Sequence, residues 1–340
     1  MKKILIKIAL FTLLLIALNE VYYRFFWKKD VHIHADTLEN LWDDPPGTEV
    51  LYFGESSNFF TEWPDTPKRR ISEFLDSLVP AKVEEVDNAG IQASNYLHIL
   101  KHLPEHYATH TIIITLNYRA FGPVWQHDKN SNYLRKADRL IAPGPKLLNR
   151  FLIALKAYGY RSDNELEADM LAGRTKPYPA AMQLPYKHMN DWNASVANGS
   201  ILRPDGSWDM DKIPVASHHV KNFAFVIEAD NPTLADYDAI VAYCAERELH
   251  LVFHLMSENI HESDSLVGPE LASIMRHNKE FLLKHYKDQD VLIVDNFETV
   301  PVWEFRDRTF PTEHYSHRGK RMCARVIRDS LIARWPNLFE

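Results

Sequence analysis

Ser56 lies where a side chain could act as a nucleophile. It belongs to the segment Gly54-Glu55-Ser56-Ser57-Asn58, directly after an apolar run at residues 50–53 that is typical of a buried strand. Ligands bind at the carboxyl ends of the strands in open α/β sheets, so a hydroxyl on this turn could be exposed to a substrate. We interpret Gly54 as the residue that permits the backbone to bend there.

A histidine near the C-terminus, His314, could supply the general base. It lies in a loop at residues 310–319, ahead of the last helical pattern, from which an imidazole can reach a nucleophile across the sheet edge. Such an imidazole needs a partner that fixes its tautomer. Glu313 is our first choice; Asp307, a backbone carbonyl and a Ser-His dyad without a third member remain open.

Two further strand ends could bind a developing oxyanion. Ala93 follows a loop at residues 87–92 and begins a helical pattern, so its backbone N–H could point at a negative charge. Asn117 follows the most apolar run, residues 111–116, and could offer its side-chain amide. Candidate substrate-cleft residues at such strand ends are Gly90, Ser257, Glu258 and Asn259, although the last three also suit a hydrogen-bonded turn.

Taken in chain order, these four blocks resemble those of the SGNH (GDSL-type) hydrolases and acyltransferases. The resemblance implies a flavodoxin-like three-layer α/β/α sandwich with a mostly parallel sheet, Ser56 as nucleophile and His314 as base. It also implies oxyanion donors at Ser56, Ala93 and Asn117. Residues 236–259 are loosely similar to the membrane-anchored SGNH-like proteins that take part in the D-alanylation of teichoic acids.

The sequence departs from the SGNH pattern at several positions. Glu55 and Tyr118 each stand where the family has aspartate, and Ala93 stands where it has the oxyanion glycine. Pro311 occupies the position three residues before His314, where the family's aspartate orients the imidazole. The third member of the triad is therefore the least determined part of the site.

The pattern along the chain favours βαβ units around a parallel sheet. Strands are expected at residues 50–53, 83–86, 111–116, 223–227, 249–255 and 291–294, each next to a helical pattern. One helix is expected to begin at Thr66-Pro67, and the last helix should place Cys323, Val326, Ile327 and Leu331 on one apolar stripe. The domain would span residues 50–340, with an insertion at about 144–220 that could form a lid over the cleft or be a surface elaboration without a role in binding.

The charge of the chain argues against a nucleic-acid partner. The 340 residues carry a net charge of -7 without a dense basic block beyond the N-terminus.

Cys244 and Cys323 are expected to be buried thiols and not a disulfide. His32 and His34 lack further ligands at a recognisable spacing, so we expect no metal and no cofactor. The oligomeric state stays open.

The N-terminus predicts a membrane anchor. Residues 1–29 combine Lys2 and Lys3, an apolar run and an aromatic-basic flank, without a small-residue cleavage site, so an uncleaved signal anchor is favoured over a removed signal peptide. Residues 30–49 would form a linker. This organisation predicts a single-pass protein of the inner membrane with its domain on the periplasmic side.

These observations predict a serine esterase or O-acyltransferase that acts on acyl esters of an envelope glycan or another small ester. The alternative is a catalytically degenerate SGNH-fold protein that binds or scaffolds envelope polysaccharide, and Pro311 is its main support.

Overall fold

The computed structural model describes residues 2–34, 47–62, 65–103, 108–127, 130–198, 209, 211–307 and 310–339. The chain forms two compact units. One comprises residues 1–44 and 129–166, and the other comprises residues 45–128 and 167–340. The second unit contains the sheet and the candidate site, and the first contains the N-terminal helix.

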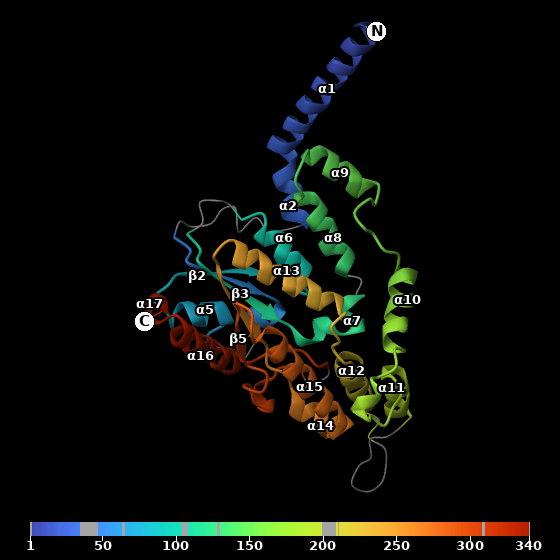
Figure 1. Cartoon of the computed structure of the whole chain (residues 1–340), viewed down its shortest axis with the longest axis vertical. Coiled ribbons are helices and arrows are strands. Elements are labelled where there is room, and N and C mark those ends of the chain that lie inside the picture. Colours follow the sequence, from blue (N-terminus) through green and yellow to red (C-terminus); the bar gives the residue numbers. More distant parts are fainter. Residues whose placement is uncertain are drawn as a thin grey trace. The chain divides into compact units, whose positions relative to one another are not determined.

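A five-stranded parallel sheet forms the centre of the second unit (Figure 1). Its strands are β1 (Val50–Gly54), β2 (Val83–Asp87), β3 (Thr111–Leu116), β4 (His250–Leu255) and β5 (Leu292–Asp295), in the order β2-β1-β3-β4-β5. This is the flavodoxin-like order of a doubly wound sheet. The predicted α/β class with a parallel sheet is confirmed.

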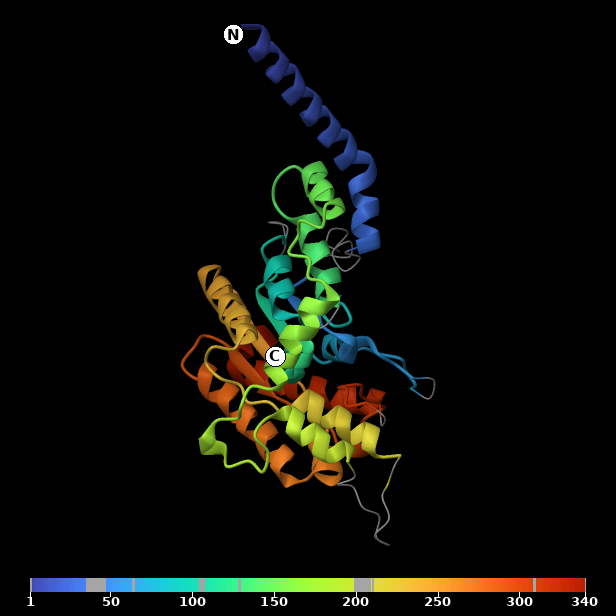
Figure 2. The ribbon, with the colours of Figure 1, turned by 90° about the vertical axis from the view of Figure 1, so that its right-hand side faces the viewer.

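Helices cover both faces of the sheet, as Figures 1 and 2 show. On one face, Tyr52, Ile113 and Val252 pack in one core with α5 (Ile71–Asp76) and α16 (His317–Arg334). On the other face, the ring of Phe53 meets Tyr96 of α6 (Ala93–Leu100). Phe253 likewise meets Tyr237 of α13 (Pro232–Glu246) and Tyr286 of α15 (Pro269–Tyr286). Side chains alternate between the two cores because successive strand residues point to opposite faces.

Five of the six predicted strands are present, and the strand predicted at residues 223–227 was wrong. Phe223 ends a helix, and the residues after it do not join the sheet. The side chain of Asn278 instead binds this segment, accepting from the Ile227 N–H at 2.8 Å and donating to the Phe225 carbonyl at 2.7 Å. The backbone N–H of Ile227 and the carbonyl of Phe225 thus bond to an amide side chain and not to a neighbouring strand.

The helix predicted from Thr66-Pro67 begins later, at Ile71, with Arg70 as its N-cap. The Thr66-Pro67 bond is cis and lies ahead of the helix. The last helix agrees with the prediction, since Cys323, Ile327 and Leu331 of α16 are buried and Val326 is partly buried against the same core. Both cysteines are free and buried, and burial raises the pKa of each thiol to about 12.

The remaining elements of the described residues are mostly short helices. They are α4 (Ser56–Phe59), η2 (Tyr118–Phe121), α7 (Pro123–Gln126), α10 (Asp163–Arg174), η3 (Ala180–Met182), α11 (Met189–Ala197), α12 (Ile213–Phe223), α14 (Ile260–Val267), η4 (Val302–Glu304) and α17 (Pro336–Phe339). The predicted insertion at about 144–220 is therefore largely helical where it is described.

The first unit contains α1 (Lys2–Tyr22), a π-helical turn η1 (Tyr23–Trp27), α2 (Lys28–His34), α8 (Asn130–Ile141) and α9 (Lys146–Ala154). The continuous helix Lys2–His34 is long and apolar enough to cross a membrane, a test that a signal sequence would also pass. The linker predicted from residue 30 was wrong for residues 30–34, which belong to α2; residues 35–46 lie outside the described residues.

Candidate active site

Ser56, His314 and Asp307 form a chain of hydrogen bonds. Ser56 is the first residue of α4, immediately beyond β1, and its Oγ lies 3.0 Å from Nε2 of His314. Nδ1 of His314 lies 2.7 Å from Oδ2 of Asp307. Ser56 and the side chain of His314 are only partly buried. This is the geometry of a nucleophile, a base and an orienting carboxylate.

A short antiparallel pairing brings Asp307 to His314. Phe305 and Tyr315 form a β-bridge, and the N–H of Arg306 donates to the carbonyl of His314 at 2.8 Å. The chain turns back between these segments, so residues seven apart in the sequence lie side by side. Asp307 thereby takes the place next to the imidazole for which Pro311 offers no carboxylate.

Glu313, our first choice as the third member, lies elsewhere. Its carboxylate forms a bidentate, buried ion pair with the guanidinium of Arg119, which follows β3. The guanidinium also stacks on the ring of Trp125, with its carbon 4.6 Å from the ring centroid. The side chains of Glu313 and His314 point to different partners because they are neighbours on an extended segment.

Two more carboxyl groups are buried beside this ion pair. Burial, reinforced by the charge of Glu313, raises the pKa of Glu55 to about 8 and holds the pKa of Glu258 well above its usual range. Among the described residues, Oε1 of Glu258 and Nη1 of Arg119 have no hydrogen-bond partner. Burial thus disfavours the charged form of both glutamates, while the Arg119 guanidinium pairs with the Glu313 carboxylate.

Of the three predicted oxyanion donors, two lie at the first residue of a helix and one lies directly after a strand. Ser56 and Ala93 are the first residues of α4 and α6, where backbone N–H groups have no partner within the helix. The Nδ2 group of Asn117 donates to Oε2 of Glu55 at 2.6 Å, and its Oδ1 accepts from the Arg119 N–H at 2.9 Å. These bonds fix the amide and leave its second hydrogen for another acceptor.

Gly54 is needed for close packing and not, as we expected, for a backbone bend. A Cβ on this residue would collide with Oδ1 of Asp87 and would lie 2.8 Å from Cβ of Asn58. Asn58 donates to Asp87 at 2.8 Å and to Ser72 at 3.0 Å, which ties the Ser56 loop to the end of β2 and to α5. The absence of a side chain at residue 54 lets this bracing form.

The ring of Phe60 packs on the face of the imidazole, and Lys320 in turn binds the backbone of Phe60. The ring of Phe60 stacks on His314 with centroids 4.0 Å apart and planes 9° from parallel. The buried amine of Lys320 donates to the carbonyl of Phe60, and burial lowers the pKa of Lys320 to about 8. Burial also lowers the pKa of His314 below its ordinary value, against the opposing charge of Asp307. A neutral imidazole at neutral pH is the state that can accept a proton.

The other candidate cleft residues differ in their surroundings. Ser257 is buried; its Oγ accepts from the Val300 N–H at 2.9 Å. Asn259 caps α14 by accepting from the Glu262 N–H at 3.2 Å. These two side chains make the turn hydrogen bonds that we left open as an alternative. Gly90 is partly buried in the β2–α6 loop and has a φ of 68°, which glycine adopts readily.

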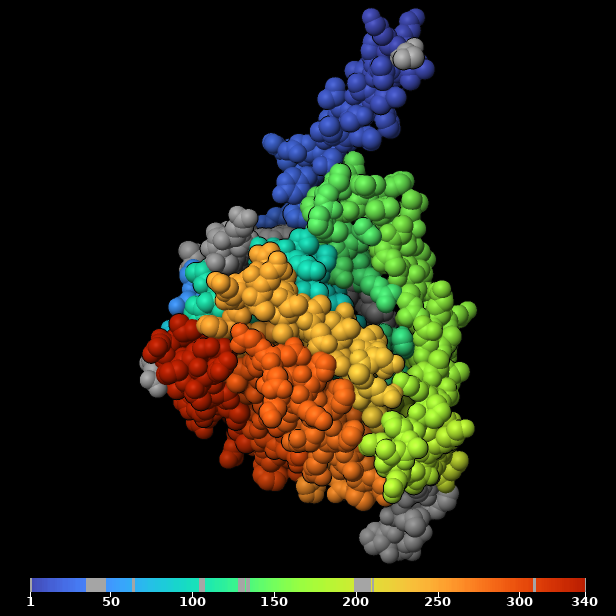
Figure 3. Space-filling model, in the orientation of Figure 1, coloured from blue at the N-terminus to red at the C-terminus, as the bar shows by residue number. Residues whose placement is uncertain are grey.

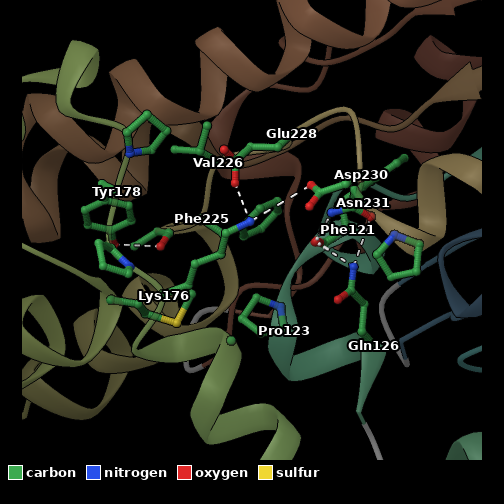
Figure 4. A pocket seen from close by; sticks show the side chains of 16 residues that line it. Phe121, Pro123, Gln126, Lys176, Tyr178, Phe225, Val226, Glu228, Asp230 and Asn231 are labelled. Atoms are coloured by element: carbon green, nitrogen blue, oxygen red, sulfur yellow. Dashed lines mark hydrogen bonds and ion pairs between the residues drawn. The ribbon is translucent and has the colours of Figure 1, made fainter.

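A separate cavity of about 210 Å³ lies in the second unit (Figure 4). Part of the predicted insertion, including Lys176 and Tyr178, lines it together with Phe225. The amine of Lys176 forms an ion pair with Glu228 at 2.5 Å. None of Ser56, Asp307 and His314 lines this cavity, so a role of the insertion as a lid over the nucleophile stays a prediction.

Sequence reasoning missed Arg119 and Phe60. A basic residue two positions after the strand-end Asn117 was a detectable signal, because a charged side chain at the edge of a buried sheet needs a partner. Phe60 had no such signal, since its contact with His314 joins residues far apart in the chain. The described residues contain no group of three or more His, Cys, Asp or Glu side chains that could hold a metal ion.

No protein-family model and no curated protein matches the sequence. Among solved structures, the chain is similar to one described as a platelet activating factor from Streptococcus pneumonia, with a TM-score of 0.40, 11% identity and coverage of 92% of this chain and 97% of that one. It is also similar to a member of the lipolytic protein G-D-S-L family from Veillonella parvula, with a TM-score of 0.36, 13% identity and coverage of 85% and 99%.

A third similar structure is an acetyl xylan esterase from Butyrivibrio proteoclasticus, with a TM-score of 0.32, 11% identity and coverage of 86% of this chain and 66% of that one. With TM-scores below 0.5, these likenesses carry no argument about activity. The strand order gives the chain a flavodoxin-like α/β fold, with Ser56 and Asn117 just beyond β1 and β3 and His314 in the loop before α16.

Proposed function

We propose that the chain is a serine ester hydrolase in which Ser56, His314 and Asp307 form the catalytic triad. The observation that carries this proposal is the pair of hydrogen bonds of His314, 3.0 Å to Ser56 and 2.7 Å to Asp307. The alternative of a degenerate binding protein drew its support from Pro311. It loses that support because Asp307 supplies a carboxylate to the imidazole from another position.

The mechanism follows from the donors and acceptors around Ser56. Asp307 accepts the Nδ1 hydrogen of His314, so Nε2 is free to take the Ser56 proton as Oγ attacks the ester carbonyl. The backbone N–H groups of Ser56 and Ala93 and the amide of Asn117 would bind the tetrahedral oxyanion, each worth about 3 kcal/mol of barrier. His314 then returns the proton to the leaving alkoxide, and water or an acceptor hydroxyl releases the acyl group from Ser56.

For the substrate, we infer an acyl ester of an envelope glycan. The support is the apolar N-terminal helix, which would hold the enzyme at a membrane as a single-pass anchor. Lys2 and Lys3 favour a cytoplasmic N-terminus and hence a periplasmic domain. A phosphatase reporter fused after residue 340 tests this orientation, because it should be active only if the domain is outside the cytoplasm.

The test of the activity uses the full-length chain in detergent. Ser56 should be labelled by a fluorophosphonate, and a small acetyl ester such as p-nitrophenyl acetate should be cleaved. The matched control is Ser57→Ala, because the neighbouring Ser57 is buried with its Oγ against the sulfur of Met256 at 3.6 Å. Labelling that is lost in Ser56→Ala and kept in Ser57→Ala supports the proposal. A folded Ser56→Ala variant with wild-type turnover contradicts it.

Hydrolysis and O-acyl transfer differ in the second half of the reaction. An acyl-enzyme formed on Ser56 would decay in water alone if the chain is a hydrolase. If it is an O-acyltransferase, decay would accelerate when a glycan with free hydroxyls is added. Intact-protein mass spectrometry of the acylated chain, with and without the glycan, distinguishes these outcomes.

A further inference from the structure

Helix α9 of the first unit has an exposed apolar face. Leu148, Phe151 and Leu155 are 50%, 58% and 60% exposed, and their spacing of three and four residues places them on one side of the helix. Asn149 and Ile153, on the other side, are buried. Large apolar side chains at this density are unusual on a surface that faces only water.

Two hydrogen-bonded contacts join α9 to the C-terminal part of the N-terminal helix. The backbone N–H of Leu147, at the start of α9, donates to the side chain of Asn19 at 3.0 Å. Arg150 binds Asp30 of α2 at 3.0 Å, and Figures 1 and 3 show α9 beside the C-terminal part of α1. At about 1.5 Å per residue, Asn19 lies about 26 Å from Lys2, close to the ~30 Å thickness of a bilayer core. The start of α9 is therefore level with one edge of that core.

The neighbouring residues have the composition of a membrane interface. Tyr23, Phe25 and Phe26 of η1 are 47%, 73% and 55% exposed, directly after the apolar run. Just beyond α9, the amine of Lys156 lies 4.3 Å from the ring centroid of Tyr160. Aromatic rings and basic side chains gather at the level of lipid headgroups, where a ring can bury its apolar part and an amine can meet a phosphate.

We propose that the apolar face of α9 docks into the interfacial region of the membrane that the N-terminal helix spans, with anionic phospholipid as its partner. This inference rests on the membrane anchoring proposed above. The bilayer is the occupant that the observations favour, because the face is fastened to the spanning helix at the bilayer edge and aromatic and basic groups flank it. The unit would then be held by a spanning helix and an interfacial helix, which restricts its rotation at the membrane surface.

The test places one environment-sensitive fluorophore on this face in the full-length chain. Phe151→Cys, and independently Leu155→Cys, are labelled with a nitrobenzoxadiazole dye; the native cysteines are buried and should not react. The matched control is Asn164→Cys, an exposed residue of α10 in the same unit. The chain is reconstituted in phosphatidylcholine vesicles containing phosphatidylglycerol and spin-labelled lipid.

Quenching at residues 151 and 155 should be several-fold stronger than at residue 164, as for side chains ~5–10 Å within the boundary of headgroups and acyl chains. Equal quenching at all three sites, with the chain still floating with the vesicles, overturns the docking and leaves the anchor intact. Disulfide-linked dimers of the unlabelled Phe151→Cys variant indicate a second copy on this face and also overturn it. Failure to float removes the anchor and the docking together. Fluorophosphonate labelling of Ser56 in the same samples reports separately on the hydrolase.

Discussion

The substitution Asp307→Asn tests whether the charge of Asp307 contributes to catalysis through His314. The Asp307 carboxylate accepts from Nδ1 of His314 at 2.7 Å, and its side chain is 29% exposed, so its charge is partly screened. With the two charges about 4 Å apart and an effective dielectric of ~20, it stabilises the imidazolium by about 4 kcal/mol. Loss of that charge should lower kcat for p-nitrophenyl acetate roughly a thousandfold, at about 1.4 kcal/mol per tenfold. Esterase kinetics and the rate of fluorophosphonate labelling of Ser56 measure the loss of activity in this variant.

The paired experiment is Glu313→Gln. Its carboxylate contacts Arg119 and not the imidazole, so this change should mainly destabilise the fold, by about 3–5 kcal/mol for a broken buried ion pair. The folded fraction should keep labelling at Ser56 far better than Asp307→Asn does. The assignment fails if Asp307→Asn, with an unchanged near-ultraviolet circular dichroism spectrum, stays within about threefold of the wild-type kcat, because the charge would then contribute less than ~1 kcal/mol.

Further outcomes follow from burial and charge. The kcat/KM profile should rise with pH through a midpoint below 6.5, the ordinary pKa of His314, and a midpoint above 7 would contradict the neutral imidazole. Arg119→Met should lower the free energy of unfolding in urea by about 3–5 kcal/mol, because Glu313 loses the cation that pairs with it; an unchanged midpoint contradicts the ion pair. Gly54→Ala should slow fluorophosphonate labelling, since the new Cβ displaces Asp87; wild-type labelling would mean that the loop tolerates the shift. The pKa of Glu55 rises from 4.5 to about 8 on folding, so the folded chain binds the extra proton and stability is lost as pH rises through this window. Glu55→Gln should reduce that loss in urea titrations at pH 5, 7 and 9.

Most of the sheet could be predicted from the sequence because β1, β3, β4 and β5 are short apolar runs, whereas β2 carries Glu84 and Glu85 between two valines. Residues 111–116 were bounded correctly at both ends, and β4 and β5 to within a residue. The run at residues 223–227 is also apolar but is not a strand: Phe223 ends α12, and Asn278, some fifty residues away in the chain, binds the backbone of Phe225 and Ile227. Composition indicates that an extended segment is buried, but it does not indicate which group will satisfy its amides.

The pair Ser56 and His314 was predictable for a similar reason, since each follows or precedes an element whose pattern is clear. The choice between Glu313 and Asp307 was not. Glu313 is closer to His314 in the sequence, but adjacent side chains on an extended segment point in opposite directions. Asp307 reaches the imidazole through the pairing of Phe305 with Tyr315, and that pairing depends on tertiary contacts that no local pattern encodes.

The ion pair between Arg119 and Glu313 connects the segment that carries His314 to the end of strand β3. Arg119 follows β3, and Asn117, two residues earlier, binds the side chain of Glu55, the residue before Ser56. The loop of the base and the loop of the nucleophile are thus both fastened to the end of one strand. This common support bears on the 3.0 Å hydrogen bond between Ser56 and His314, which joins residues 258 positions apart in the chain. We therefore expect the buried ion pair to affect the geometry of the triad. Arg119→Lys keeps the positive charge but loses the bidentate contact with Glu313, and it should lower kcat more than it raises KM.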